Sequence, residues 1–259
     1  MHSACSVRDL VRDYGGLRAL AGISFEIRPG EIFGLIGPNG SGKTTTLRIV
    51  ATLLKPTSGT VTVLGMDVTE KPGDARRMIS YLPEDAGAYK NLSGINYLRF
   101  MATFYTPGDK ARDEMIERAT GIADLGERLK DKVKTYSKGM MRKLLLARAL
   151  MTEPKLAILD EPTSGLDVGN SMEIRGRVKE FARNGTTVLL SSHNMLEVEF
   201  LSDRVALIRQ GRIIETGTPD ELKQKHGCRN LEEVFLRLEG LASETPVGQS
   251  AGAGVQGVK

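Results

Sequence analysis

The chain has 259 residues, of which 40% are hydrophobic and 26% charged, and its formal net charge is +4. This length and composition allow a sizeable core, and the small positive charge alone indicates no nucleic-acid or membrane partner. Cys5 and Cys228 form no CxxC pattern, which excludes a disulfide framework or zinc site and favours a reducing cytosol. No apolar run approaches the roughly 18 residues of a membrane span, and residues 1–6 lack a signal-peptide pattern. We therefore expect a cytoplasmic protein that reaches a membrane only through a partner.

Strand patterns open the chain, and helical patterns dominate its middle. We expect strands at residues 6–11, 22–27, 31–36 and 60–64, and a helix at residues 43–54. From about residue 84 to residue 151 the pattern turns mostly helical, with helices expected at residues 91–105, 109–122 and 138–151. This helical stretch is interpreted as an inserted subdomain.

Strands and helices alternate again after residue 151, which predicts a mainly parallel sheet. The expected elements are a strand at 155–160, a helix at 168–183, a strand at 186–192, a helix at 194–201 and a hairpin at 204–209 and 212–215. We expect one folded domain over about residues 1–240, with a core at 1–83 and 152–240 and the helical insertion at 84–151. Residues 241–259 are rich in Gly, Ser, Ala and Val and are interpreted as a flexible tail.

The segment GPNGSGKTT matches the phosphate-binding pattern of two glycines with four residues between them, followed by Lys and Thr. Its members are Gly37, Pro38, Asn39, Gly40, Ser41, Gly42, Lys43, Thr44 and Thr45. Glycine permits positive φ values and close backbone approach, and a helix N-terminus favours anions. Lys43 adds a charge for the β- and γ-phosphates, and the Thr44 hydroxyl is suited to ligate Mg²⁺. The segment therefore predicts a nucleoside triphosphate site.

Asp160 and Glu161 end an apolar strand in the second half of the chain. Asp160 is placed to hold the Mg²⁺ shell, as the acidic residue of a phosphate-loop NTPase does. Glu161 is one residue further and is expected to face differently, because strand side chains alternate. It is a candidate general base that polarises the attacking water.

Four weaker features accompany these two motifs. Tyr136 to Met140 (YSKGM) open a helix, and the Ser137 hydroxyl, Gly139 and the helix N-terminus suggest a second anion site. The segment SGLD ends at Asp167, and the segment SSH ends at His193. Tyr14 precedes the phosphate loop and offers a ring that could stack on a base.

Together and in this order, the motifs resemble the ATP-binding-cassette (ABC) ATPase family over roughly residues 6–240. Residues 37–45 match Walker A, Asp160 and Glu161 match Walker B and the catalytic glutamate, and His193 matches the switch histidine. Ser137, Lys138 and Gly139 match the family signature, residues 164–167 match the D-loop, and Tyr14 matches the adenine-stacking aromatic residue. The resemblance implies an α/β phosphate-loop (RecA-like) core, a small N-terminal antiparallel sheet and an inserted helical subdomain.

The resemblance also implies a function and partners. In the family, two cassettes pair head to tail around two MgATP, and the signature of one faces the Walker A loop of the other. A groove of the helical subdomain takes a short helix of a separate membrane permease. The signature and the segment LEEVFL at residues 231–236 look like those of exporters of drugs, ions or polysaccharides. We thus expect a homodimeric ATPase on the cytoplasmic face of the membrane.

One residue departs from the family pattern. The family usually has glutamine after Tyr-Leu-Pro, whereas Glu84 follows Tyr81, Leu82 and Pro83 here. A carboxylate still ligates Mg²⁺ but donates no hydrogen bond when ionised. Glu84 is therefore kept as a third metal candidate beside Thr44 and Asp160.

Two other function classes remain open at this point. A soluble ABC ATPase could act on ribosomes or DNA, although the chain has one cassette, no coiled-coil insertion and no dense basic stretch. A nucleic-acid partner is therefore not expected. A module that binds nucleotide without turnover is the other class, and the presence of Lys43, Asp160, Glu161 and His193 argues against it.

Overall fold

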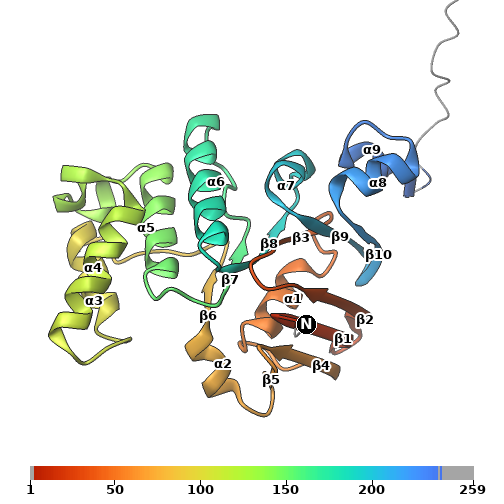
Figure 1. Cartoon of the computed structure of the whole chain (residues 1–259), viewed down its shortest axis with the longest axis horizontal. Helices are drawn as coiled ribbons and strands as arrows, with labels where there is room; N and C mark the ends of the chain where they lie inside the picture. The colour runs from red at the N-terminus through yellow and green to blue at the C-terminus, as the bar shows by residue number, and fades with distance from the viewer. Residues whose placement is uncertain (1–2, 239, 241–259) are drawn as a thin grey trace, which may run out of the picture.

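The computed structural model describes residues 3–238 and 240, and within them the strands form two sheets (Figure 1). A four-stranded sheet has the order β2-β1-β4-β5, and a six-stranded sheet has the order β10-β9-β3-β8-β7-β6. The strands are β1 Cys5–Tyr14, β2 Leu17–Ile27, β3 Ile32–Ile36, β4 Ser58–Val63, β5 Met66–Asp67, β6 Ile79–Leu82, β7 Leu156–Asp160, β8 Thr187–Ser192, β9 Arg204–Arg209 and β10 Arg212–Gly217.

The larger sheet is mainly parallel. Strands β6, β7, β8, β3 and β9 run parallel to their neighbours, and only the edge strand β10 pairs antiparallel, with β9. The smaller sheet is antiparallel throughout. Both the expected mainly parallel sheet and the expected N-terminal antiparallel sheet are confirmed.

The helices surround the sheets and extend beyond them at both ends of the molecule (Figure 1). They are α1 Lys43–Val50, α2 Pro72–Met78, α3 Gly94–Ala102, α4 Asp109–Ala123, α5 Lys138–Leu150, α6 Val168–Arg183, α7 Met195–Leu201, α8 Pro219–His226 and α9 Leu231–Leu238. Helices α3, α4 and α5 gather at one end of the molecule, and α8 and α9 lie at the opposite end (Figure 1). All residues of the helical stretch expected at 84–151 thus lie between β6 and β7.

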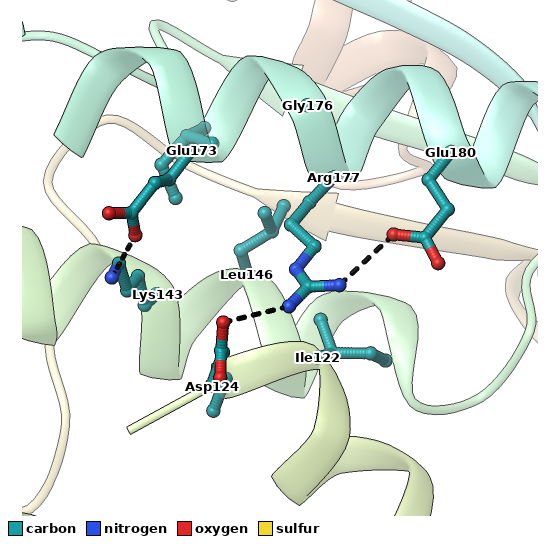
Figure 2. Close-up of a pocket in the computed structure, with 10 residues that line it drawn as sticks. Ile122, Asp124, Lys143, Leu146, Glu173, Gly176, Arg177 and Glu180 are labelled. Carbon is teal, nitrogen blue, oxygen red and sulfur yellow. Dashed lines mark hydrogen bonds and ion pairs between the residues drawn. The ribbon is translucent and has the colours of Figure 1, made fainter. Parts of the chain in front are cut away.

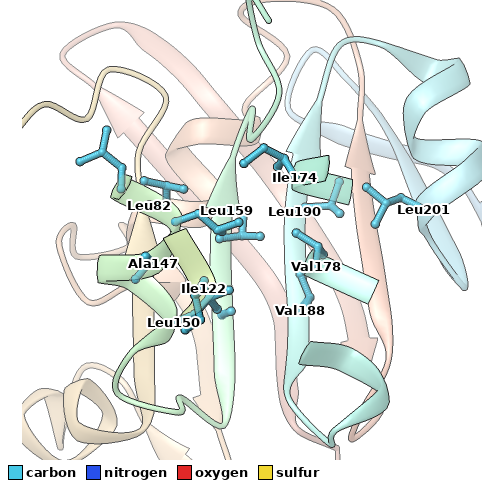
Figure 3. Packing of buried hydrophobic residues seen from close by; sticks show 14 of the residues in the cluster. Leu82, Ile122, Ala147, Leu150, Leu159, Ile174, Val178, Val188, Leu190 and Leu201 are labelled. Atoms are coloured by element: carbon cyan, nitrogen blue, oxygen red, sulfur yellow. The ribbon is translucent and has the colours of Figure 1, made fainter. Parts of the chain in front are cut away.

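Alternation along the buried strands builds two hydrophobic layers. In β7, Leu156 and Ile158 join the cluster that contains α1 and the antiparallel sheet, whereas Leu159 joins the opposite cluster. That opposite cluster packs Leu159, Leu190 and Val188 against Ile174 and Val178 of α6 (Figure 3). Burying one such side chain contributes roughly 1.5–3 kcal/mol. The sheet is therefore fixed from both faces, and its loops at the carboxyl edge are held on a rigid support.

Several boundaries differ from the sequence expectation for local reasons. Helix α1 ends at Val50 rather than at residue 54, because Thr52 has a left-handed φ of 62°. Helix α3 begins at Gly94 rather than at residue 91, because the Ser93 side chain caps it by accepting from the Asn96 N–H. The short elements α2, β5 and β6 and the helices α8 and α9 were not expected.

Two further expectations concern the membrane and the tail. Among residues 3–238 and 240, no helix combines the length and apolar character that a bilayer crossing needs. The flexible tail expected at residues 241–259 lies outside the described residues.

Candidate functional site: a nucleotide site at the carboxyl edge of the sheet

The register of the parallel strands gathers the predicted motifs at one edge. Ile36 at the end of β3 is paired with Ser192 at the end of β8, and Asp160 at the end of β7 is paired with Ser191. Leu82 at the end of β6 is paired with Leu159. Because parallel strands end on the same edge, the loops that follow these four strands lie side by side.

The phosphate loop has the backbone that the sequence predicts. Gly40 and Gly42 have φ values of 78° and 112°, which favour glycine. A Cβ on Gly37 would lie 2.1 Å from the Ile208 carbonyl oxygen, so only glycine allows this close approach. The N-terminus of α1 carries no side-chain cap, and the Ser41 Oγ is buried without a hydrogen-bond partner in the described residues. These unpaired donors fit an anionic phosphate group.

Lys43 is buried at the base of this loop. Its Nζ donates to the Gly37 carbonyl at 2.7 Å and the Pro38 carbonyl at 3.2 Å, and it lies 3.9 Å from Glu161 Oε1. Burial lowers the pKa of Lys43, and the charges of Glu161, Asp160 and Glu84 act in the opposite direction. The ammonium is thus held inside the loop, within reach of a phosphate that displaces the two carbonyls.

Asp160 and Thr44 lie together as the metal prediction requires. The Thr44 hydroxyl donates to Asp160 Oδ1 at 3.4 Å, and the Ser191 hydroxyl donates to the same oxygen. The Tyr81 hydroxyl donates to Asp160 Oδ2 at 3.4 Å, and burial together with the Asp160 charge raises the pKa of Tyr81 to about 12. One hydroxyl and one oriented carboxylate suit Mg²⁺, which keeps several waters and binds substrate phosphates.

Glu161 lies beyond the end of β7 rather than within it. Its φ is 47°, so a left-handed turn, and not the alternation of a strand, sets the direction of its side chain. The carboxylate is buried, with His193 Nδ1 2.9 Å from Oε1 and the Ser192 hydroxyl donating to Oε2 at 3.3 Å. The structure thus brings Glu161, His193 and Lys43 into one cluster.

The signature segment lies apart from the phosphate loop. Ser137 and Lys138 are exposed at the start of α5, where the Ser137 Oγ accepts from the Met140 N–H at 3.2 Å. They line a 430 Å³ pocket together with Glu84 and residues 164–166, and no residue of the phosphate loop lines it. The chain therefore presents two separate candidate anion sites.

The start of α6, just after the D-loop, packs against this signature. Asp167 caps α6 by accepting from the Asn170 N–H at 2.9 Å, a bond that lowers the pKa of Asp167. A Cβ on the buried Gly139 would lie 2.3 Å from the Asn170 side chain, so glycine allows α5 and α6 to meet here. Glu84 contacts the same loop, since its Oε1 accepts from the Ser164 hydroxyl at 3.2 Å.

Tyr14 ends β1 in the hairpin beside the phosphate loop. The Arg12 guanidinium lies 4.5 Å from the centre of the Tyr14 ring, which is 43% exposed. The following strand β2 approaches Gly42, whose Cβ position is 2.8 Å from the Ala19 carbonyl oxygen. The role of Tyr14 in stacking on a base stays a prediction.

A smaller pocket lies away from this edge, between α6, α5 and the end of α4 (Figure 2). Its volume is 270 Å³, and ion pairs of Lys143 with Glu173 and of Arg177 with Asp124 and Glu180 line it. None of the predicted site residues lines this pocket, so it adds nothing to the nucleotide site.

Sequence reasoning missed two buried polar groups around the site. Arg142 donates to backbone carbonyls of the loops after β6 and β7, and the Glu197 carboxylate accepts from the Thr163 hydroxyl. Arg142 shares the helix face of the buried Leu145, Leu146 and Ala149, so a charged residue at a core-facing position was the available signal. Glu197 follows His193 closely, and that proximity was the available signal.

Comparison with known proteins agrees with this geometry. The family described as ABC transporter matches residues 20–164. The "Probable multidrug ABC transporter ATP-binding protein YbhF" of Escherichia coli is 38% identical over 239 residues, covering 89% of this chain and 41% of that protein. The chain thus spans less than half the length of this relative.

A further relative and a solved structure cover more of their own length. The "Daunorubicin/doxorubicin resistance ATP-binding protein DrrA" of Streptomyces peucetius is 39% identical over 241 residues, covering 93% of this chain and 72% of that protein. A structure described as the ATP-binding subunit of an ABC transporter matches with a TM-score of 0.81 and 30% identity, covering 92% of this chain and all of that one. The chain therefore belongs to the ABC transporter family of ATP-binding proteins.

Proposed function

We propose that this chain binds and hydrolyses MgATP as the ATPase subunit of an ABC transporter. The observation that carries the proposal is the buried Glu161 carboxylate, held between Lys43 and His193 beside the phosphate loop. Lys43 and His193 can act on a γ-phosphate, and Glu161 can act on the water that attacks it. Such a constellation exceeds what nucleotide binding alone requires.

The reaction assigns a role to each group. ATP binding draws Lys43 Nζ from the Gly37 and Pro38 carbonyls to the β- and γ-phosphates, while N–H groups of the loop hold the phosphate oxygens. Glu161 accepts a proton from water as the water oxygen bonds to the γ-phosphorus and the bond to ADP breaks. His193 holds the γ-phosphate side and, through Nδ1, keeps the Glu161 carboxylate oriented. Thr44, Asp160 and Glu84 would hold Mg²⁺, which neutralises charge on the β- and γ-phosphates when bound.

We infer a head-to-tail pair of chains as the working unit. Ser137 lies in a pocket that the phosphate loop does not line, so one chain does not close its own site over ATP. A second copy that supplies Ser137, Lys138 and Gly139 would complete it. Pairing would also exclude water from the reacting phosphate, which strengthens every charge interaction there.

The partner at the membrane is proposed to be a separate permease, which would hold the chain on the cytoplasmic face. Tyr89, Phe100 and Phe104 form an aromatic cluster on and beside α3. The ring centre of Phe100 lies 5.4 Å from that of Tyr89 and 5.1 Å from that of Phe104. Tyr89 is 57% and Phe104 67% exposed, and exposed aromatic clusters mark interaction surfaces. The names of DrrA and YbhF, which refer to drug resistance and multidrug transport, favour export of organic compounds.

Two variants test the proposed chemistry. Glu161→Gln keeps the size of the side chain and removes the base, so we expect ATP affinity to persist while phosphate release slows by about 10²-fold or more. Lys43→Ala removes the cation of the loop, so we expect it to lose MgATP binding. Glu173→Gln is the matched control, because Glu173 is a carboxylate of α6 that pairs with Lys143 outside the site. Normal turnover by Glu161→Gln, or loss of ATP affinity in it, would contradict the proposal.

A further inference from the structure

Arg142 of α5 is a buried cation, and within residues 3–238 and 240 its side chain donates hydrogen bonds to five backbone carbonyls. Arg142 is only 7% exposed to solvent. Nε donates to the Pro162 carbonyl at 2.7 Å, and Nη2 donates to the carbonyls of Asp160 at 2.9 Å and Glu161 at 2.7 Å. Three successive carbonyls at the end of β7 therefore converge on one guanidinium.

The same side chain also reaches the joint after β6. Nη1 donates to the Pro83 carbonyl at 3.1 Å and to the Glu84 carbonyl at 3.3 Å. All three guanidinium nitrogens thus donate to carbonyls, which uses the full planar fork of the side chain. One residue of the signature helix connects the Glu84 joint to the loop of the catalytic glutamate.

The backbone that Arg142 holds is an unusual one. Glu161 has a φ of 47°, a left-handed conformation that is uncommon for a residue with a Cβ and persists only where the surroundings stabilise it. The Glu161 N–H donates to the Ser191 carbonyl at 3.1 Å, and the Glu161 carbonyl accepts from Arg142. These bonds on both sides of the residue orient the carboxylate toward His193 and Lys43.

Three carboxylates offset part of the cost of burying the Arg142 charge. Burial lowers the pKa of Arg142, and the charges of Asp160, Glu84 and Glu161 oppose that effect. A lysine ammonium is compact and has no planar fork, so it cannot reproduce the bonds to both loops. The planar shape of the guanidinium is therefore what lets one side chain bond to both loops.

We propose that Arg142 is a positioning residue for hydrolysis: it fixes the Glu161 backbone to the signature helix and to the Glu84 joint. Glu161 then keeps its catalytic orientation only while α5 is seated against both loops. A shift of α5, or of the Glu84 joint, is transmitted directly to the general base. This inference rests on the proposed function of Glu161.

Hydrogen exchange of the nucleotide-free full chain tests the contact itself. In Arg142→Lys we expect faster amide exchange at residues 83–86 and 160–166 together, with residues 37–45 unchanged. Lys143→Gln is the matched control, since the neighbouring Lys143 forms its ion pair with Glu173 of α6 (Figure 2). Arg142→Gln, which keeps a planar donor group without the charge, serves as the second variant should Arg142→Lys not fold. Unchanged exchange in either loop overturns the proposal.

Kinetics in two backgrounds test whether Arg142 acts through Glu161. In the wild-type background we expect Arg142→Lys to lower kcat by about tenfold or more while KM for ATP changes by less than about threefold. In a Glu161→Gln background the same substitution is expected to change the residual rate by less than about twofold, because effects of residues that act as a unit are not additive.

The outcomes separate this inference from the function on which it rests. Equal losses in both backgrounds would show that Arg142 supports the fold rather than Glu161, and they overturn this inference alone. Undiminished turnover in Glu161→Gln overturns the proposed base and this inference together. A rise in KM that accounts for the whole loss also counts against a positioning role.

Discussion

Glu161 and Glu197 are two buried carboxylates near the same loop, and their surroundings give them different properties. The Glu161 carboxylate lies 3.9 Å from Lys43 Nζ and 2.9 Å from His193 Nδ1. Glu197 accepts from the Thr163 hydroxyl, and burial raises its pKa despite that hydrogen bond and the charge of Arg175. The first carboxylate is suited to accept a proton from water, whereas the second joins α7 to the loop after β7.

The raised pKa of Glu197 leads to a prediction about stability. A carboxyl group whose folded pKa exceeds its unfolded value holds its proton more tightly in the native state. Its effect is therefore to lower the free energy of unfolding as pH rises from the unfolded pKa of about 4.3 through the folded pKa. The amide of Glu197→Gln does not ionise, so the variant does not lose this free energy of unfolding. Its side-chain oxygen can still accept the hydrogen bond from the Thr163 hydroxyl. We therefore expect it to unfold at a higher temperature than the wild type at pH 8.

Thermal unfolding at pH 5 and pH 8 checks this expectation. The difference in unfolding temperature between Glu197→Gln and the wild type should be smaller at pH 5 than at pH 8. Glu173→Gln, a more exposed carboxylate with a lysine partner, should show no such gain at pH 8. A Glu197→Gln protein less stable than the wild type at pH 8 would show that the charged form is the stabilising one.

At the scale of elements, α5 and α6 meet so closely that the signature and the D-loop form one unit. Gly139 of α5 touches the Asn170 side chain of α6, and Asp167 caps α6 while bonding to the same asparagine. Ser137 at the exposed start of α5 remains available to a second chain. The two motifs are thus expected to move together when the pair of chains closes.

Mixing two inactive variants tests whether Ser137 acts across the pair. Ser137→Arg spoils the signature and keeps Lys43, whereas Lys43→Ala spoils the phosphate loop and keeps the signature. In about half of the dimers of an equal mixture the chains differ, and each such dimer has one intact site, so about a quarter of wild-type activity should return. Phosphate release measures the recovery.

The control for this mixture cannot rebuild a site. Ser137→Arg mixed with the double variant Ser137→Arg, Lys43→Ala offers no intact signature to any phosphate loop, and we expect no recovery. Mixed dimers that form but stay inactive in the first mixture would count against the head-to-tail arrangement.

At the scale of the whole molecule, Glu84 stands where β6 leaves the parallel sheet and the helical stretch begins. Its side chain reaches the Ser164 hydroxyl, and its carbonyl is held by Arg142. A residue in this place can respond to the metal and to the helices that carry the exposed aromatic cluster. We therefore expect Glu84 to affect coupling more than chemistry.

Two Glu84 variants test coupling with the proposed permease in proteoliposomes. Glu84→Gln removes one negative charge near the proposed metal and adds a donor, and Glu84→Ala removes the ligand without adding one. Lys43, Thr44 and Asp160 remain, so ATP binding should change little, while transport per ATP hydrolysed should change more than the basal ATPase rate. Equal transport-to-hydrolysis ratios in all three proteins would make Glu84 an ordinary loop carboxylate.

The sequence by itself determined the phosphate loop, the acidic end of β7 and the alternation that gives a parallel sheet. These features are local, since glycine placement and side-chain periodicity act within a few residues. The bounds of α6 and β9 follow from such periodicity as expected. Elements such as α2, β5 and β6 are too short to leave a periodic signal.

The tertiary structure alone decided which distant groups meet at the carboxyl edge. The pairing of Asp160 with Ser191 and of Ile36 with Ser192 places Lys43, Glu161 and His193 within reach of one another. The left-handed turn at Glu161 depends on loops that only packing brings together, and so does the burial of Arg142. Contacts between residues far apart in the chain arise from sheet register and helix packing, and neither is encoded within a short stretch of sequence.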